Sequence, residues 1–505
     1  MKKLYIFLLI VICLAAFMVR YPYTFSMSFN DDESLYMWYA KQLSIDYRYL
    51  FSEQILEFHP PLFPVILSLF DIHHRRISSY RMTTLFLSIF GIIFIYFIGL
   101  KIRGWFVGLL SSIFLAFNYL YTAESTLVMI DLALSISIMF LFLCILYVSD
   151  QDKVLFHILV GIAGGIAILL KYSGIVVLPL IFACYMSIYN LSLSDKIKKF
   201  FIPFIIILVI VCLIHIYNFV VVGTPFPYYM PSRFVDYSHL NTTLLFYFKN
   251  QHQILMYIPL IIFFYYGLIT LIVYKKDRYR WFLLSYVGVL FIIMSFFYIK
   301  AYRFSLMFLP SMIIISVIGI DNMLTQFVRW VKRKRYIRVR KTTIELLVIL
   351  LSVILVGIYQ KRVFSLLDGN STVCVGYLEA ARYIKDRCGT DTVIISEMPR
   401  VLRYFSDIDF VKFGGKIISL PRKKKQFATL VRQIKGDILL EVSVWDEMQP
   451  SELPSFFDYN AEKQYFSTWG FNLVKTIKKN IHINTYEKRL TPVIRIYWRK
   501  ALNES

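Results

Sequence analysis

Long apolar runs constrain the fold of this chain more than any other feature. A helix needs roughly 17–25 apolar residues to cross the hydrocarbon core of a bilayer. Hydrophobic residues make up 58% of the 505 residues and charged residues 17%, which is typical of membrane proteins. The sequence therefore predicts a polytopic α-helical membrane protein with about 11 transmembrane helices. The runs that predict them are residues 4–19, 82–100, 104–121, 128–148, 155–170, 173–190, 200–222, 254–274, 281–299, 303–320 and 342–360.

Two apolar segments need separate treatment. The first run follows MKK, as a secretory signal would, but no A-x-A cleavage pattern follows it, so we expect it to remain as an anchor. The stretch PPLFPVILSLF (60–70) is too short and too rich in proline to span a bilayer. We expect that segment to be interfacial or re-entrant.

Basic residues predict the orientation, because lysine and arginine collect in cytoplasmic loops. If the N-terminus is cytoplasmic, every inside loop is basic, and the last (329–341) is the most basic. We expect a multi-pass protein of the cell membrane with residues 20–80, 223–253 and 361–505 outside. The sequence does not show whether this outside is a cell exterior, a periplasm or an organelle lumen. The net charge of +23 then reflects membrane orientation, and we expect no nucleic-acid partner.

The polar tail predicts a second domain. YLEAARYIKDR (377–387) has helical spacing, and TVIIS (392–396) and DILLEV (437–442) are typical of short buried strands. We therefore expect a transmembrane domain over 1–360, with a catalytic first outer loop at 20–80, and a small extracytoplasmic α/β domain over 361–505. The expected extracytoplasmic location permits a disulfide between Cys374 and Cys388 but does not require one.

Charged residues near the membrane gather at its predicted outer edge rather than at its midplane. Lysine and arginine at span ends often extend to the headgroups, and a loop histidine is usually an ordinary polar residue. Asp131 is different, because an acid one turn inside an apolar span is costly unless it is paired or functional. A coupled transporter would place ionisable groups near the midplane, so the pattern favours a site at the outer face. Its candidate members are Asp131 in STLVMIDLALS, Lys171 in LLKYSG, Arg303 in IKAYRF, His59 in EFHPPLF, and Arg81.

The stretch FNDDESLYMWYA (29–40) places three carboxylates, Asp31, Asp32 and Glu33, in the first outer segment. Helical spacing follows, so these acids fit the capping position and first turn of a helix. A capping acid can also be catalytic. The aromatic residues of this helix would then lay it in the membrane interface; they are Tyr36, Trp38 and Tyr39.

An ordered set of motifs resembles the GT-C glycosyltransferases, in particular the dolichyl-phosphate-mannose protein mannosyltransferases and the lipid A aminoarabinose transferase (ArnT-like) group. Together the motifs cover most of the chain. Two departures are Phe304, where the late motif has tyrosine, and His59, where the aminoarabinose group tends to have lysine. The motifs are FNDDESLYMWYAKQL, EFHPPLFPVILSLF, SSYRMTTLFLSIFGI, STLVMIDLALS, AGGIAILLKYSGIVVLPL, IKAYRFSLMFLPSM and YLEAARYIKDRCGTDTVIISEMP.

The resemblance implies a GT-C type membrane fold and an integral membrane glycosyltransferase. Such an enzyme would transfer a hexose or pentose from a dolichyl- or undecaprenyl-phosphate donor to an acceptor hydroxyl at the outer face, with inversion. The short inside loops carry no Walker or G-x-G-x-x-G motif for a nucleotide sugar. The alternative is a polyprenyl-linked lipid flippase or transporter without transferase activity. The sugar, the acceptor (lipid, glycan or protein) and the oligomeric state stay open.

The chemistry of such a transfer assigns roles to the candidate residues. Asp32 would be the general base, and Glu33 and Asp131 would position the acceptor or tune Asp32. Lys171 and Arg303 would bind the leaving phosphate. His59 and Arg81 are further candidates for the phosphate region. The carboxylates can also hold a divalent cation, although nothing in the sequence requires a cofactor.

Overall fold

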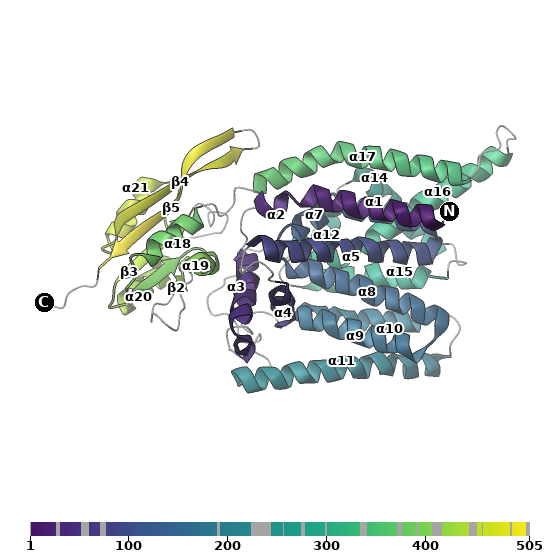
Figure 1. The fold of residues 1–505 in the computed structure, drawn as a ribbon, viewed down its shortest axis with the longest axis horizontal. Coiled ribbons are helices and arrows are strands. Elements are labelled where there is room, and N and C mark those ends of the chain that lie inside the picture. Colours follow the sequence, from purple (N-terminus) through teal and green to yellow (C-terminus); the bar gives the residue numbers. More distant parts are fainter. Residues whose placement is uncertain are drawn as a thin grey trace. The chain divides into compact units, whose positions relative to one another are not determined.

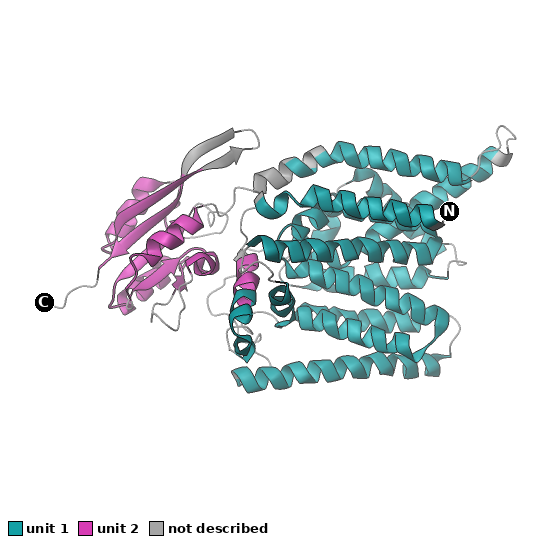
Figure 2. Cartoon of the chain, in the orientation of Figure 1, with its two compact units in different colours: residues 1–25, 40–231, 240–364 teal, residues 26–39, 232–239, 365–505 magenta. Residues whose placement is uncertain are grey.

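The computed structural model divides the chain into two compact units (Figure 2). Unit 1 comprises residues 1–25, 40–231 and 240–364, and unit 2 comprises residues 26–39, 232–239 and 365–505. The segment 26–39 therefore groups with the C-terminal residues, whereas the sequence analysis assigned it to the transmembrane domain. The structure describes residues 2–26, 31–51, 60–70, 77–188, 192–223, 244–255, 257–273, 278–297, 300–333, 341–370, 376–389, 392–406, 417–443, 452–456, 458–484 and 487–500.

Unit 1 is a bundle of apolar helices (Figure 1). Among the described residues, six helices are long and apolar enough to cross a membrane, and four more apolar helices are shorter. This pattern is that of an integral membrane protein, whereas the count of about 11 spans stays a prediction. The long helices are α1 (Lys2–Arg20), α5 (Ile77–Arg103), α8 (Ile130–Gln151), α11 (Leu193–Val222), α16 (Leu309–Arg333) and α17 (Lys341–Asn370). The shorter ones are α9 (Val154–Leu170), η3 with α10 (Tyr172–Val176 and Val177–Met186), α14 (Ile258–Val273) and α15 (Arg280–Phe296).

The run predicted as one span at 104–121 is two helices, α6 (Trp105–Ala116) and α7 (Tyr119–Ser125), bent by 62°. Asn118 causes this break. Its side chain accepts a hydrogen bond from the Tyr121 N–H (3.2 Å), so it caps α7. Its amide also donates to the Ile254 carbonyl (2.9 Å). With these two hydrogen bonds, the buried Asn118 side chain stabilises a turn between α6 and α7 in place of a continuous helix.

The run at 303–320 starts differently from its prediction, whereas the expectation that 60–70 is interfacial or re-entrant stays a prediction. The run at 303–320 begins as a 3₁₀ turn, η5 (Tyr302–Met307), and α16 starts only at Leu309. The stretch 60–70 contains one short helix, α4 (Leu62–Leu69), which packs on α9. Arg303 therefore lies in a turn that precedes a long helix, and not inside a helix.

Unit 2 contains a five-stranded sheet with the strand order β2-β1-β3-β5-β4. β1, β2 and β3 are parallel, while β5 is antiparallel to β3 and β4. The central strand β3 is buried along its whole length, as its apolar sequence ILLEVS favours. The strands are β1 (Val393–Ser396), β2 (Ile417–Ser419), β3 (Ile438–Ser443), β4 (Asn472–Asn484) and β5 (Glu487–Arg499), and the helices of the C-terminal segment are α18 (Tyr377–Lys385), α19 (Pro399–Ser406), α20 (Lys424–Gln433) and α21 (Tyr459–Ser467).

Aromatic packing forms one core of unit 2. The ring of Phe427 in α20 contacts Phe466 (5.7 Å between centroids) and Phe471 (6.3 Å), and Phe466 contacts Tyr497 of β5 (5.3 Å). This packing fixes the ends of α21, β4 and β5 against one another. Cys374 lies outside the described residues, so its pairing with Cys388 stays open.

Candidate active site

Asp131 is a buried carboxylate in the first turn of α8. Its Oδ1 accepts a hydrogen bond from Lys171 Nζ (2.7 Å), and its Oδ2 lies 3.5 Å from Arg303 Nε. One turn further along α8, the Ser135 hydroxyl donates to the Leu306 carbonyl (2.6 Å), which holds η5 against this end of the helix. Three segments that are distant in sequence therefore meet at one carboxylate. A helix N-terminus also favours a negative charge.

The turn after α9 positions Lys171. The Lys171 backbone is extended, which ends the helix, and its carbonyl accepts from the Gly174 N–H (2.7 Å). A Cβ atom at Gly174 would lie 2.2 Å from the Ala167 carbonyl oxygen, so only glycine fits this turn. The turn formed by KYSG (171–174) thereby holds Lys171 where its ammonium reaches Asp131.

An aromatic ring completes the cluster of Asp131, Lys171 and Arg303, which we call the outer cluster. Phe304 lies 4.7 Å from Lys171 Nζ and 5.6 Å from the Arg303 guanidinium carbon. Both cations thus contact a carboxylate and the face of a ring, which attracts positive charge. The side chain of Lys171 is 12% exposed and that of Arg303 is 28% exposed. Phe304 was noted in the sequence only as a departure from a motif.

The outer cluster has the chemistry of an anion-binding site with a built-in counter-charge. One carboxylate and two cations leave a net positive charge. An ammonium and a guanidinium carry three and five N–H donors, more than one carboxylate can accept. Ionised donors of this kind form short, strong hydrogen bonds to phosphate oxygens.

Asp32 and Glu33 lie in the first turn of α3 (Asp31–Ile45). The Asp32 carboxylate is partly exposed and accepts a hydrogen bond from Arg400 Nη1 of α19 (3.2 Å). Glu33 is fully buried. One turn after Arg400, the Arg403 guanidinium lies 4.8 Å from the centre of the Trp38 ring. Both contacts are within unit 2, so α19 holds the start of α3 through two arginines.

The aromatic face of α3 differs from its prediction. Tyr36, Trp38 and Tyr39 are only 2–4% exposed, so the expectation that they lay the helix in a membrane interface is wrong. An interfacial helix leaves its apolar face open to lipid, whereas these rings are packed inside the protein. Residues 33–40 of the helix are therefore buried, whereas Asp32 in its first turn stays partly exposed.

Of the remaining phosphate-site candidates, Arg81 is described and His59 is not. Arg81 is buried in α5 and donates to the Thr24 carbonyl (3.4 Å). His59 lies outside the described residues. The structure thus brings Asp131, Lys171 and Arg303 together in unit 1, while Asp32 and Glu33 begin α3 in unit 2.

A metal site is not evident in the part of the chain that the structure describes. No group of three or more histidine, cysteine, aspartate or glutamate side chains there is arranged to hold an ion. The side chain of Asp31 and all of His59 fall outside this part. A divalent cation therefore stays an expectation.

Two arginines have tertiary contacts that no local sequence pattern marks. Arg20, at the end of α1, is fully buried and donates to Ser125 Oγ (2.7 Å) and to the carbonyls of Ala16 (2.9 Å) and Ala116 (2.5 Å). An arginine at the end of an apolar run normally extends to the headgroups, so nothing local marks this one as buried. Arg400 contacts Asp32 across 368 residues of sequence, and no local pattern predicts that.

Comparisons with known proteins support one family resemblance. The family model described as dolichyl-phosphate-mannose-protein mannosyltransferase matches residues 58–217. By sequence, no curated protein matches the chain.

Solved structures share the fold. ArnT from Cupriavidus metallidurans in the apo state matches with a TM-score of 0.61 at 11% identity, covering 98% of this chain and 97% of that chain. The same protein bound to undecaprenyl phosphate matches with a TM-score of 0.58 at 10% identity over the same shares. The archaeal oligosaccharyltransferase AglB from Archaeoglobus fulgidus, in complex with an inhibitory peptide and a dolichol-phosphate, matches with a TM-score of 0.63 at 10% identity, covering 87% of this chain and 69% of that chain. The resemblance to GT-C enzymes of the ArnT and protein mannosyltransferase kind, which the motifs predicted, is thus confirmed by a family model and by the fold.

Proposed function

We propose that this protein is a membrane glycosyltransferase that moves a sugar from a polyprenyl-phosphate donor to an acceptor hydroxyl at the outer face of the membrane. The observation that carries the proposal is the outer cluster, where Lys171 and Arg303 share the carboxylate of Asp131. The similar structures that hold undecaprenyl phosphate and dolichol-phosphate support this class of donor. A polyprenyl chain would stay in the bilayer while its phosphate reaches the cluster.

Lys171 and Arg303 bind the donor phosphate in this proposal. As the bond between the anomeric carbon and the phosphate oxygen breaks, the electron pair stays on that oxygen and negative charge develops there. Fixed cations stabilise such charge without reorganising at the moment of reaction. The negative charge of Asp131 keeps the Lys171 ammonium and the Arg303 guanidinium in place and offsets the repulsion between them. We therefore assign Asp131 a positioning role for the two cations.

Asp32 takes the proton of the acceptor. The acceptor oxygen attacks the anomeric carbon from the side opposite the phosphate, its proton passes to the Asp32 carboxylate, and the sugar is transferred with inversion. A carboxylate that acts as a base must be accessible to the acceptor, and Asp32 is partly exposed whereas Glu33 is fully buried. Glu33 is therefore assigned to support of the first turn of α3.

Donor dependence tests this proposal. Purified protein in lipid nanodiscs is given a panel of labelled polyprenyl-phosphate sugars together with an acceptor extract, and the transfer of label from the lipid is followed for wild type and Lys171→Gln. We expect one donor to be consumed, with a KM raised about tenfold to a hundredfold in the variant, which loses charged hydrogen bonds to the phosphate. Lys249→Gln, which changes an exposed lysine of α12 (Phe246–Lys249), is the matched control. An unchanged KM in Lys171→Gln would contradict the assignment.

A further inference from the structure

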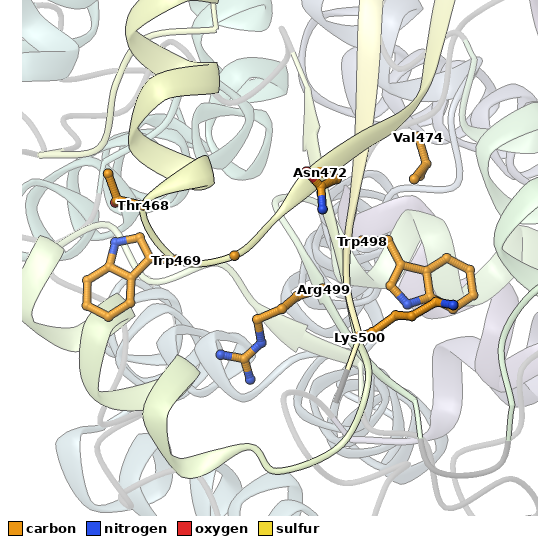
Figure 3. Close-up of a pocket in the computed structure, with 8 residues that line it drawn as sticks. Thr468, Trp469, Asn472, Val474, Trp498, Arg499 and Lys500 are labelled. Carbon is orange, nitrogen blue, oxygen red and sulfur yellow. The ribbon is translucent and has the colours of Figure 1, made fainter. Parts of the chain in front are cut away.

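A pocket of about 670 Å³ lies in unit 2, at the ends of β4 and β5. Eight residues line it, from the turn after α21 and from the ends of both strands (Figure 3). This volume is in the range of small-molecule sites, which is roughly 300–1,000 Å³. None of its residues takes part in the reaction proposed above.

The core of unit 2 fixes the aromatic walls of this pocket. Trp469 packs edge-on against Phe427 (6.1 Å between centroids), and the Arg432 guanidinium lies 5.5 Å from its ring. Trp498 stands opposite Asn472 in the antiparallel register of β4 and β5. Directly opposed residues of neighbouring strands project from the same face of a sheet. Figure 3 shows the two tryptophans on opposite sides of the pocket with Arg499 between them.

Two hydrogen-bond donors in the pocket lining are buried without a partner among the described residues. They are the indole Nε1–H of Trp498 and the Nε–H of Arg499. Arg499 uses another nitrogen, Nη2, to donate to the Ile434 carbonyl (2.8 Å), which anchors the side chain. Both orphan groups can only donate. Nearly all buried polar groups in proteins are hydrogen-bonded, so a ligand that displaces the side chains covering these two atoms would supply the missing acceptor oxygens.

The charge of the lining selects the kind of ligand. Arg499 and Lys500 are both basic, and no acidic residue is among the eight that line the pocket. Burial also lowers the pKa of Arg499, so its guanidinium gains from a nearby anion. Aromatic side chains with a polar atom suit ligands that have apolar faces and polar edges, which is the character of a sugar ring.

We propose that this pocket is a binding site for a saccharide that carries a carboxylate or a phosphate. The sugar ring lies against the tryptophans, its hydroxyl oxygens accept from Trp498 Nε1 and the Asn472 amide, and the anionic group pairs with Arg499 and Lys500. This binding site is independent of the outer cluster. It gives the C-terminal part of the chain a recognition role that does not need the transfer reaction.

Calorimetric titration of the full-length protein in lipid nanodiscs tests the proposal, with trigalacturonate, mannose 6-phosphate and neutral maltotriose as probes. At least one anionic saccharide should bind saturably and about tenfold or more tighter than maltotriose, because charged hydrogen bonds are lost with the neutral sugar. Trp498→Phe keeps an aromatic ring but removes the donor, and it should weaken binding about fivefold. Trp469→Ala should weaken it about tenfold or more.

The controls separate recognition from folding. Trp330→Phe, at an exposed position of α16 in unit 1, should bind like wild type. Each variant is compared with wild type by thermal unfolding, and Trp498→Phe carries the test if Trp469→Ala does not fold. Absence of saturable binding, equal affinity in Trp498→Phe, or a triglutamate peptide that binds as tightly as the best saccharide would overturn the proposal. None of these outcomes depends on sugar transfer.

Discussion

The Asp131 carboxylate lies 2.7 Å from the ammonium of Lys171, and its other oxygen faces Arg303. An acid buried at the start of an apolar helix is thereby paired with two bases from other segments. The pairing compensates the cost of burying Asp131. In the proposed reaction, Asp131 holds these two cations for the donor phosphate.

Asp131→Asn should impair both stability and transfer. The change keeps the shape of the side chain but removes the charge, which leaves two partly buried cations beside each other. Breaking a buried ion pair from one side costs about 3 kcal/mol, and the loss of preorganised charge should lower kcat by about a hundredfold. Thermal unfolding and initial rates in nanodiscs measure the two effects. Asp195→Asn, in the first turn of α11, is the matched control, which should keep the wild-type rate and lose less than about 1 kcal/mol of stability.

Arg400→Gln should loosen the first turn of α3 without unfolding the protein. The Asp32–Arg400 pair is 30% and 26% exposed, and such pairs contribute under about 1 kcal/mol to global stability. Hydrogen–deuterium exchange should therefore rise within residues 32–39, while the unfolding temperature changes little. Arg400→Lys should restore part of the protection, and Arg387→Gln, at an exposed site in unit 2, should change nothing. Unchanged exchange in Arg400→Gln would mean that the pair does not hold α3.

Asp152 is expected to stabilise the end of α8 opposite Asp131. Its carboxylate pairs with Lys199 of α11 and His157 of α9 (3.2 Å). Burial alone would raise the pKa of Asp152, but hydrogen bonds from these two residues outweigh it and lower the pKa. A lowered folded-state pKa means that the stabilisation is present above the ordinary value of 3.8 and is lost as the pH falls below it.

Asp152→Asn tests this pairing. Asparagine is the suitable replacement because Asp152 has φ 43°, a left-handed conformation that asparagine tolerates. Since Asp152 is about half exposed, the variant should lose no more than about 1 kcal/mol at neutral pH. The stability difference between the two proteins should be largest near pH 7 and should shrink as the pH falls below 3.8. A difference that does not shrink over this range would contradict the ion-pair explanation.

The helical bundle could largely be predicted from the sequence, because a long apolar run is a local signal. The break at Asn118 could not, since one of its partners, Ile254, is 136 residues away. Likewise, the apolar runs mark Asp131, Lys171 and Arg303 as candidates by their positions, but the approach of the two cations to the Asp131 carboxylate depends on how the helices pack. The contact of Arg400 with Asp32 and the burial of Arg20 also depend on partners that are distant in the sequence.

The central claim is that the protein transfers the sugar and does not merely move the lipid. The most direct measurement uses vesicles that contain the purified protein, a labelled polyprenyl-phosphate sugar that the wild type accepts, and an acceptor extract. Both the loss of label from the lipid and the leaflet of the remaining lipid are followed, for wild type and Asp32→Asn. The account predicts that label leaves the lipid in wild type, and that this loss falls at least about a thousandfold in Asp32→Asn while donor KM is kept. Label that stays on the lipid but crosses to the other leaflet equally in both proteins would contradict it and indicate a transporter.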